Sequence, residues 1–356
     1  MARLNISDTL SKDSQMWDLY TLRHEYVPPR EDVCRSIYVP KDRKQILRPV
    51  ASGYLADSGM KAEYPDGKKF AVMLSHDIDD IYPPLSHTLL SSVHHVRNLR
   101  LGKLRRELLW KVEGRHTSPY RNFKEIMKIE EAYGGKSSFY FMTADRDIRR
   151  HRYDIEELES DLGYIADKGW EVGLHGGFYT CADLGEMQNE KARLEKVLGR
   201  TVVGYRNHYL RFRVPVTWEL LAEAGFKYDT TLGYNDALGC RNGMCHPFKP
   251  FSLKTGKEID LVEIPLIIMD GTLFGASDSF AEAWATAKQI IDEVERYNGV
   301  VTILWHNNVF SSAFRETWKK IYINILKYSS GKNAWITSGE EIWKWSCRND
   351  RCTDRQ

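Results

Sequence analysis

The amino-acid sequence predicts an α/β fold, a distorted (β/α)7-8 barrel of parallel strands. Short apolar runs alternate with helix-like segments over most of the chain, and polar residues capable of chemistry stand where these runs end. Strands that alternate with helices pair in parallel through right-handed crossovers, and about eight such units close most readily into a barrel. The 356 residues, 42% of them hydrophobic, suffice for its core.

Eight apolar runs are the expected strands. The first, 70–74, consists of consecutive apolar residues without polar alternation, which is typical of a strand buried on both faces. The others are 138–142, 170–174, 202–205, 226–229, 262–269, 300–305 and 334–337. Helices are expected at 122–132, 155–168, 188–198, 216–224, 279–296 and 314–328.

The chain divides into three parts by pattern. Residues 1–66 show no sustained period and are expected to form an irregular N-terminal extension on the barrel, with one helix at 14–24. The barrel covers 67–346, and 347–356 form a C-terminal tail. Within the barrel, 81–118 is a helical insertion in which basic and apolar residues interleave. Such a segment is usually a solvated face, but it could also lie against an anionic membrane.

Composition limits which binding partners and which cellular location are expected. The 51 basic and 49 acidic residues argue against nucleic acid as a partner of the whole molecule. No apolar run is long enough for a signal peptide or a membrane span, so a cytoplasmic location is expected. The six cysteines are expected to be reduced and packed, with a four-cysteine zinc site from two C-x4-C pairs as the lesser alternative. They are Cys34, Cys181, Cys240, Cys245, Cys347 and Cys352.

Polar residues stand at the ends of most expected strands. They are Asp77 and Asp79 after the first, His175 after the third, Arg206 and His208 after the fourth, Asp229 after the fifth, Asp270 after the sixth and His306 after the seventh. The C-terminal ends of parallel barrel strands open on one face, where active sites lie. On an extended backbone Asp77 and Asp79 point to the same side, where a cation or a shared proton must relieve their repulsion. Together the set supplies an acid–base pair, nitrogen and oxygen metal ligands and an arginine.

Four segments carry a family resemblance: Ser75-His-Asp-Ile-Asp79, Glu171-Val-Gly-Leu-His175, Gly204-Tyr-Arg-Asn-His-Tyr209 and Ile303-Leu-Trp-His306. They resemble motifs of the polysaccharide deacetylase family, the NodB-homology domain of carbohydrate esterase family 4, over residues 69–345. The resemblance implies the following roles: Asp77 as catalytic base, Asp79 and His175 as metal ligands, Arg206 as the group that holds the base, the Tyr209 amide as an oxyanion donor and His306 as general acid.

The chain departs from the family pattern at the metal shell. The family's second metal histidine lies four residues after the first, where this chain has Tyr179, and His208 stands where proline is usual. The second aspartate of the first motif is displaced to Asp79. These departures are typical of a divergent branch. The predicted shell is Asp79, His175 and His208, with Tyr179 as the competing third ligand, because a phenol with a pKa of about 10 is a poor ligand unless the metal deprotonates it.

The expected function is metal-dependent hydrolysis of an N-acetyl or O-acetyl group on a saccharide or glycan precursor. Zn²⁺ is the first choice of cofactor, and other divalent first-row ions remain open. Asp229 and Asp270 are further candidates for contacting substrate or orienting His306. Two alternatives stay open: a catalytically silent carbohydrate-binding or scaffold protein, and a metal-dependent hydrolase of a small non-sugar amide. The sequence leaves the sugar, the acyl group and the oligomeric state undetermined.

Overall fold

The structure is a computed structural model that describes residues 5–26, 34, 45–148 and 150–351. Its centre is a nine-stranded sheet in the order β8-β5-β4-β3-β2-β1-β10-β9, with β11 paired to β1. The strands are β1 (Ala71–Ile78), β2 (Ser138–Phe141), β3 (Glu171–Gly176), β4 (Gly204–Asn207), β5 (Tyr228–Asp229), β8 (Val262–Glu263), β9 (Ile268–Met269), β10 (Val300–Leu304) and β11 (Trp335–Thr337). All of these pairs are parallel, which confirms the predicted barrel-like α/β fold.

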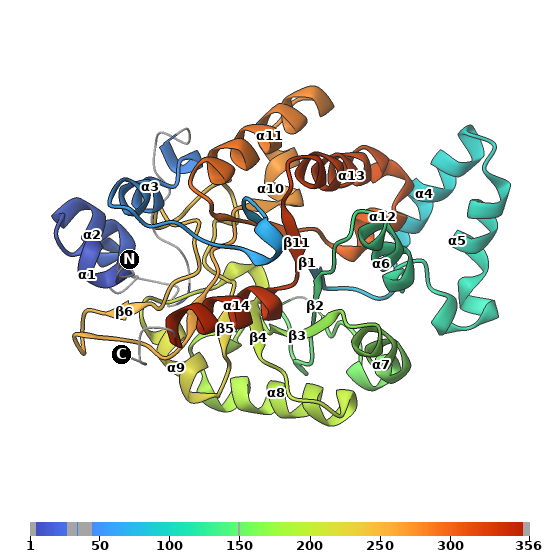
Figure 1. Cartoon of the computed structure of the whole chain (residues 1–356). Helices are drawn as coiled ribbons and strands as arrows, with labels where there is room; N and C mark the ends of the chain where they lie inside the picture. The colour runs from blue at the N-terminus through green and yellow to red at the C-terminus, as the bar shows by residue number, and fades with distance from the viewer. Residues whose placement is uncertain (1–4, 27–33, 35–44, 149, 352–356) are drawn as a thin grey trace.

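Helices surround this sheet (Figure 1). They include α6 (Phe123–Glu131), α7 (Glu159–Asp167), α8 (Leu184–Leu198), α9 (Val216–Glu223), α11 (Phe280–Arg296) and α13 (Glu316–Gly331), each within a predicted helical range or close to it. The last helix, α14 (Gly339–Arg351), continues past residue 346, where the barrel was expected to end. Its Ile342 packs with Met73, Tyr140 and Tyr228 in a second buried cluster.

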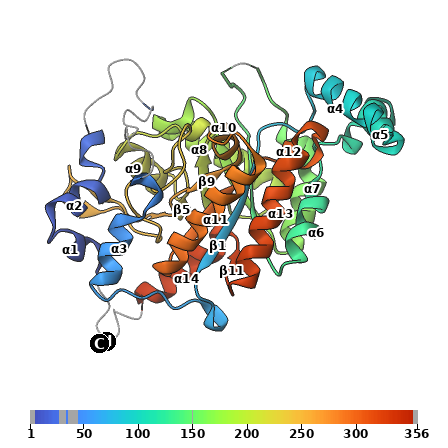
Figure 2. The same cartoon turned by 90° about the horizontal axis from the view of Figure 1, so that it is seen from above.

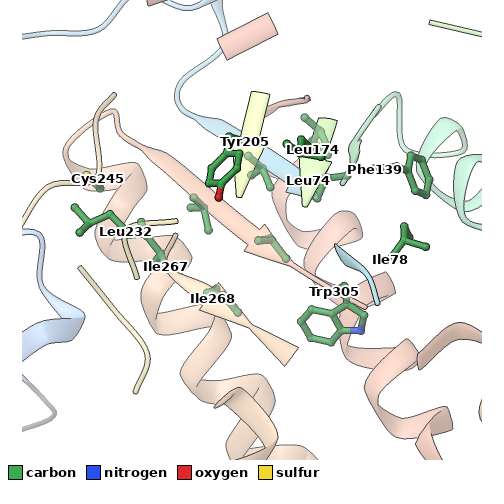
Figure 3. Close-up of a cluster of buried hydrophobic side chains, with 14 of the residues drawn as sticks. Leu74, Ile78, Phe139, Leu174, Tyr205, Leu232, Cys245, Ile267, Ile268 and Trp305 are labelled. Carbon is green, nitrogen blue, oxygen red and sulfur yellow. The ribbon is translucent and has the colours of Figure 1, made fainter. Parts of the chain in front are cut away.

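Side-chain alternation along β1 separates two layers of the core. Val72, Leu74 and Ile78 belong to the main hydrophobic cluster, part of which Figure 3 shows, whereas Ala71 and Met73 belong to the cluster that contains Ile342. The strand runs to Ile78 because it pairs first with β11 and then with β2, and therefore it carries Asp77 within the sheet.

The expected strand 262–269 is broken into two. β8 and β9 lie at opposite ends of the strand order, and the segment between them contains Pro265, which has no amide hydrogen to donate. The Ile264 amide donates to the Asp229 carbonyl in β5, and the Ile267 amide donates to the Thr302 carbonyl in β10. The segment therefore crosses from one end of the sheet to the other.

The N-terminal extension contains three α-helices among its described residues, α1 (Ile6–Leu10), α2 (Ser14–Tyr20) and α3 (Val50–Asp57). The helix expected at 14–24 ends at Tyr20, because the chain turns at Leu22 with a positive φ of 53°. The hydroxyl of Tyr20 donates to the Lys249 carbonyl at 2.6 Å, and the Ala51 amide donates to the Gly243 carbonyl at 2.9 Å. These contacts attach the extension to the loop that precedes β8.

A disulfide joins Cys34 to Cys181, so the expectation that all cysteines are reduced is wrong for this pair. The two residues are 147 positions apart, and packing brings them together: the Phe212 amide donates to the Cys34 carbonyl. Cys240 and Cys245 lie in the core, as packing residues do, whereas Cys352 falls outside the described residues. Because disulfides persist mainly in oxidising compartments, the bond weighs against the expected cytoplasmic location.

Glu171 is buried at the start of β3 and accepts hydrogen bonds from Ser138 Oγ at 2.6 Å, the Tyr228 hydroxyl at 2.6 Å and the Glu340 amide at 2.8 Å. Burial raises its pKa from 4.5 to about 7. The folded state therefore keeps a proton that the unfolded chain releases, and stability falls as pH rises through this window.

We expect Glu171→Gln to remove much of this pH dependence, which amounts to about 3 kcal/mol for a shift of this size. The measurement is thermal unfolding between pH 5 and pH 8, in which the melting temperature of the variant should decline less than that of the parent. The exposed Glu186→Gln is the matched control and should follow the parent. Equal declines in the parent and in Glu171→Gln would contradict the assignment.

Candidate active site

A cavity of about 490 Å³ lies at the C-terminal ends of the strands. It is lined by Asp77, Asp79, Asp80, Pro84, Arg150, Arg152, His175, His208, Tyr209, Leu210, Asn235, Met269, Gly271, Leu304 and His306. The structure thus brings six predicted residues into one cavity. Five were predicted from strand ends, and Tyr209 was predicted from the Gly204–Tyr209 motif. Arg206 and Asp270 contact members of this group, and Asp229 lies elsewhere.

Arg206 holds Asp77 from inside the barrel. The Arg206 Nη1 atom donates to Asp77 Oδ1 at 2.9 Å and to Ser75 Oγ at 2.8 Å, while its Nε donates to the Thr230 carbonyl at 3.0 Å. The guanidinium is fully buried and lies 4.8 Å from the centre of the Tyr140 ring. A buried charge needs a partner, and Asp77 supplies it, which leaves the second carboxylate oxygen of Asp77 facing His175 Nε2 at 3.7 Å.

Asp79, His175 and His208 form a trio whose ligand atoms all lie within 4.8 Å of one another. The Asp79 Oδ1 atom is 3.2 Å from His175 Nε2 and 3.5 Å from His208 Nδ1, and the two nitrogens are 3.1 Å apart. Ligands of a tetrahedral Zn²⁺ stand about 3.3 Å apart, given metal–ligand distances near 2 Å. Asp79 Oδ1 is also buried without a hydrogen bond. The donor types, their spacing and this unsatisfied oxygen fit a divalent first-row ion.

The charges of neighbouring residues shift the pKa values of Asp79 and His175. Burial raises the pKa of Asp79, but the nearby charge of His208 and the close approach of both histidine rings outweigh burial and hold this pKa well below its usual value. Burial lowers the pKa of His175, but the charge of Asp77 and contacts with Asp79 raise it overall. The site therefore favours a positive charge next to the carboxylates, as a metal ion would provide.

A backbone hydrogen bond orients His175, and charged groups lie next to His208. His175 Nδ1 donates to the Arg206 carbonyl at 2.9 Å, which leaves its Nε2 lone pair directed at the trio. His208 follows β4, whose backbone stays extended through Asn207, so its side chain lies on the same side as that of Arg206. Its Nε2 atom lies 3.8 Å from Asp147 Oδ1 and 3.3 Å from Arg152 Nη2.

Asp147 was missed at the sequence level. Its side chain is buried, Oδ1 has no hydrogen bond, and Oδ2 accepts from Arg152 Nε at 2.5 Å. The negative charge of Asp147 lies 3.8 Å from His208 Nε2, beyond hydrogen-bond distance, and favours positive charge on or next to that ring. The signal that points to it is the strand-end rule applied to the second strand, since Asp147 follows β2 by six residues.

We expect Asp147→Asn to weaken metal binding by about ten- to a hundredfold, because the variant loses the negative charge that lies near His208 and that pairs with Arg152. The measurement is competition for Zn²⁺ with a chromophoric chelator. Asp145→Asn is the matched control, since Asp145 lies two residues away with its side chain 91% exposed. If both variants hold zinc as the parent does, Asp147 has no such role.

His306 and Asp270 form the second pair at the cavity. His306 Nδ1 donates to Asp270 Oδ1 at 2.8 Å, and the His306 amide donates to Asp270 Oδ2 at 2.8 Å. His306 Nε2 lies 3.8 Å from Asp79 Oδ2. Burial lowers the pKa of His306, but the charge and hydrogen bond of Asp270 outweigh it and raise the value to about 10. The ring is therefore protonated at neutral pH and can act as an acid.

The two tyrosines take different positions. Tyr209 lines the cavity within a tight turn where both it and Leu210 have a positive φ, of 58° and 51°, an uncommon conformation that is found at functional sites. Tyr179 is 46% exposed, and its ring stacks with the Arg146 guanidinium at 4.8 Å. It does not line the cavity.

Asp229 is the predicted residue that the structure does not bring to the site. Its Oδ1 accepts from the Thr231 amide at 3.1 Å and from the Thr231 hydroxyl at 2.6 Å, and it lies beside Glu263. Burial raises its pKa to about 6. In the short strand β5 it is the neighbouring Tyr228 that enters the cluster with Met73 and Tyr140, so Asp229 points to the other face.

No protein-family model and no curated protein sequence matches the chain. A structure of a candidate polysaccharide deacetylase from Mycobacterium smegmatis aligns with a TM-score of 0.53 at 20% identity, covering 80% of this chain and 92% of that chain. A peptidoglycan deacetylase from Bacillus subtilis aligns with a TM-score of 0.40 at 13% identity, covering 82% and 98%. A pseudoenzyme of carbohydrate esterase family 4 from Bacillus anthracis aligns with a TM-score of 0.39 at 11% identity, covering 79% and 66%.

The first of these alignments extends over most of both chains, and at 20% identity it establishes the fold. The sequence motifs around Asp77, His175, Arg206 and His306 had indicated the same resemblance. The chain therefore has the NodB-like fold of the polysaccharide deacetylases.

Proposed function

We propose that the protein is a metal-dependent deacetylase that removes an N-acetyl or O-acetyl group from a saccharide or glycan precursor. The observation that carries this proposal is the placement of two oriented acid–base groups, Arg206–Asp77 and Asp270–His306, around the trio in one cavity. Hydrolysis of an amide requires a base, an acid and a group that stabilises the oxyanion.

Asp79, His175 and His208 would hold the ion, with Zn²⁺ as the first choice. When bound, the ion supplies Lewis-acid chemistry, polarising a carbonyl and making a water molecule more acidic. Asp77 keeps one oxygen on Arg206 and has the other available to take a proton from the attacking water. The carbonyl carbon gains the new C–O bond, and the amide hydrogen of Tyr209 donates to the oxygen that becomes negative.

His306 completes the reaction. Its Nε2 faces the cavity while Nδ1 is held by Asp270, so the proton on Nε2 is the one it can transfer to the leaving nitrogen. The C–N bond breaks, and acetate and a free amine result. With an O-acetyl substrate the same proton goes to the leaving oxygen and an alcohol forms. The exposed ring of Tyr209 at the rim is a suitable surface for a sugar ring.

The test is release of acetate from a panel of N-acetylated and O-acetylated saccharides, peptidoglycan fragments and N-acetylated nucleotide sugars. We expect acetate from at least one class in the presence of Zn²⁺, loss of activity with a chelator and its return when metal is added back. Absence of acetate from the whole panel, with stoichiometric metal bound, would overturn the proposal.

A further inference from the structure

The helical hairpin of α4 (Leu85–Arg97) and α5 (Leu101–Glu113) carries most of the exposed large apolar side chains. Among the described residues, fifteen such side chains are exposed, and ten lie in this hairpin. These ten are Leu85, Leu89, Leu90, Val93, Val96, Leu99, Leu101, Leu108, Leu109 and Val112. The hairpin projects from the barrel in both views (Figures 1 and 2). A patch of this kind on a soluble surface marks an interaction site.

The apolar face of α4 is turned to solvent, the reverse of the usual arrangement in an amphipathic helix. Leu85, Leu89, Val93 and Val96 recur at helical spacing on one face of α4, and that face is exposed. The face of α4 that is buried carries Ser91 and His95 instead. Packing on the barrel therefore does not explain the apolar stripe.

On α5, exposed apolar residues stand beside exposed cations. Leu101, Leu108 and Val112 lie on its outer face, Arg105 lies among them, and Val112 is 85% exposed. The inner side of the hairpin contacts the rest of the molecule through an ion pair of Arg100 with Glu316 on α13 and through the Trp110 ring, which is buried and stacks on Tyr82. The exposed apolar residues of both helices take no part in these contacts.

The charge of the hairpin indicates which kind of surface would bind its apolar face. Between positions 85 and 115 the chain has seven lysines and arginines but two acidic residues, Glu107 and Glu113, whereas the whole chain has a formal net charge of +2. Cations that flank an apolar face match the interface of an anionic bilayer, where apolar side chains enter the acyl boundary and cations reach phosphate groups. A second copy of the hairpin would place like charges against each other.

We propose that α4 and α5 bind in the plane of an anionic phospholipid bilayer. In the described part of the chain, no helix has the length and hydropathy to cross a membrane, so the proposed contact is interfacial. Leu85 directly follows Pro84, which lines the active-site cavity, so the proposed membrane contact begins next to the cavity along the chain. This inference goes beyond the proposed function and does not depend on it, because the site that it concerns contains no catalytic group.

The test is flotation of the full chain with vesicles of phosphatidylglycerol and phosphatidylcholine, compared with vesicles of phosphatidylcholine alone. We expect binding to the anionic vesicles at low salt that weakens as salt rises. The variant Leu89→Ser/Val93→Ser/Leu108→Ser/Val112→Ser should bind at least about tenfold more weakly, because it removes apolar surface without changing charge. Arg97→Gln/Lys111→Gln should weaken binding by about fivefold for each cation.

The matched control is Val50→Ser/Phe280→Ser, which removes two exposed apolar side chains outside the hairpin and should bind as the parent does. Circular dichroism and thermal unfolding establish that each variant is folded. The charge variant and the salt series test the proposal even if the four-serine variant does not fold.

Three outcomes would overturn the proposal: no binding to anionic vesicles at low salt, equal binding by the parent and the folded four-serine variant, or a dimer that the four-serine variant abolishes while vesicles remain unbound. The third outcome would assign the hairpin to self-association. Because flotation does not measure acetate, failure here leaves the proposed deacetylase function unaffected, and failure of that function leaves this inference unaffected.

Discussion

Asp77→Asn is expected to lower acetate release by about a thousandfold, within the range that general-base catalysis contributes. The amide has nearly the shape of the carboxylate and can still accept from Arg206 Nη1 at the position of Oδ1, 2.9 Å away. It cannot take a proton from water. His306→Ala should cause a loss of similar size, because the leaving group then departs without the acid that Asp270 holds in place.

The measurement is the steady-state rate on the best substrate of the panel, together with metal content and melting temperature for each variant. Asp229→Asn is the matched control, since Asp229 is also a buried aspartate at a strand end but does not line the cavity. It should keep activity within a few-fold of the parent. If Asp77→Asn and His306→Ala release acetate as fast as the parent while folded and metal-loaded, the assigned acid–base roles are wrong.

His208→Ala should lose the bound ion as fully as His175→Ala does. A divalent site that keeps one position open for water has three protein ligands, and removal of one leaves two that cannot compete with a chelator. In the structure His208 Nδ1 lies 3.1 Å from His175 Nε2 and 3.5 Å from Asp79 Oδ1. We expect the content after dialysis to fall from about one ion per chain to almost none.

Tyr179→Phe is the control for this prediction, because Tyr179 stands at the family's position for the second histidine and yet does not line the cavity. It should keep the ion. Elemental analysis after dialysis and the rise in melting temperature on adding Zn²⁺ give two independent readings. Retention of metal by His208→Ala together with its loss from Tyr179→Phe would assign the third ligand to Tyr179.

The sequence by itself determined most of the strands, most of the helices and the face on which the site lies. Patterns over a few residues carry this information: an apolar run specifies a buried strand, and a spacing of two residues puts Asp77 with Asp79, and Arg206 with His208, on one side of an extended chain. Parallel pairing then brings strand ends to one mouth. For this reason the sequence alone assigns His175 and His306, which are 131 positions apart, to one site.

Only the tertiary structure decided features that depend on distant segments. Whether Asp229 or Asp270 meets His306 depends on which face of a two-residue strand turns inward, and that is set by packing of Tyr228 rather than by local pattern. The Cys34–Cys181 disulfide and the contact of Asp147 with His208 likewise join residues that are far apart in sequence. The sequence does not tell which of its distant residues meet in space. Periodicity shows which side chains share a face of a helix or strand. Which neighbour that face contacts is decided only when the chain packs, because burial and pairing are properties of the assembled core.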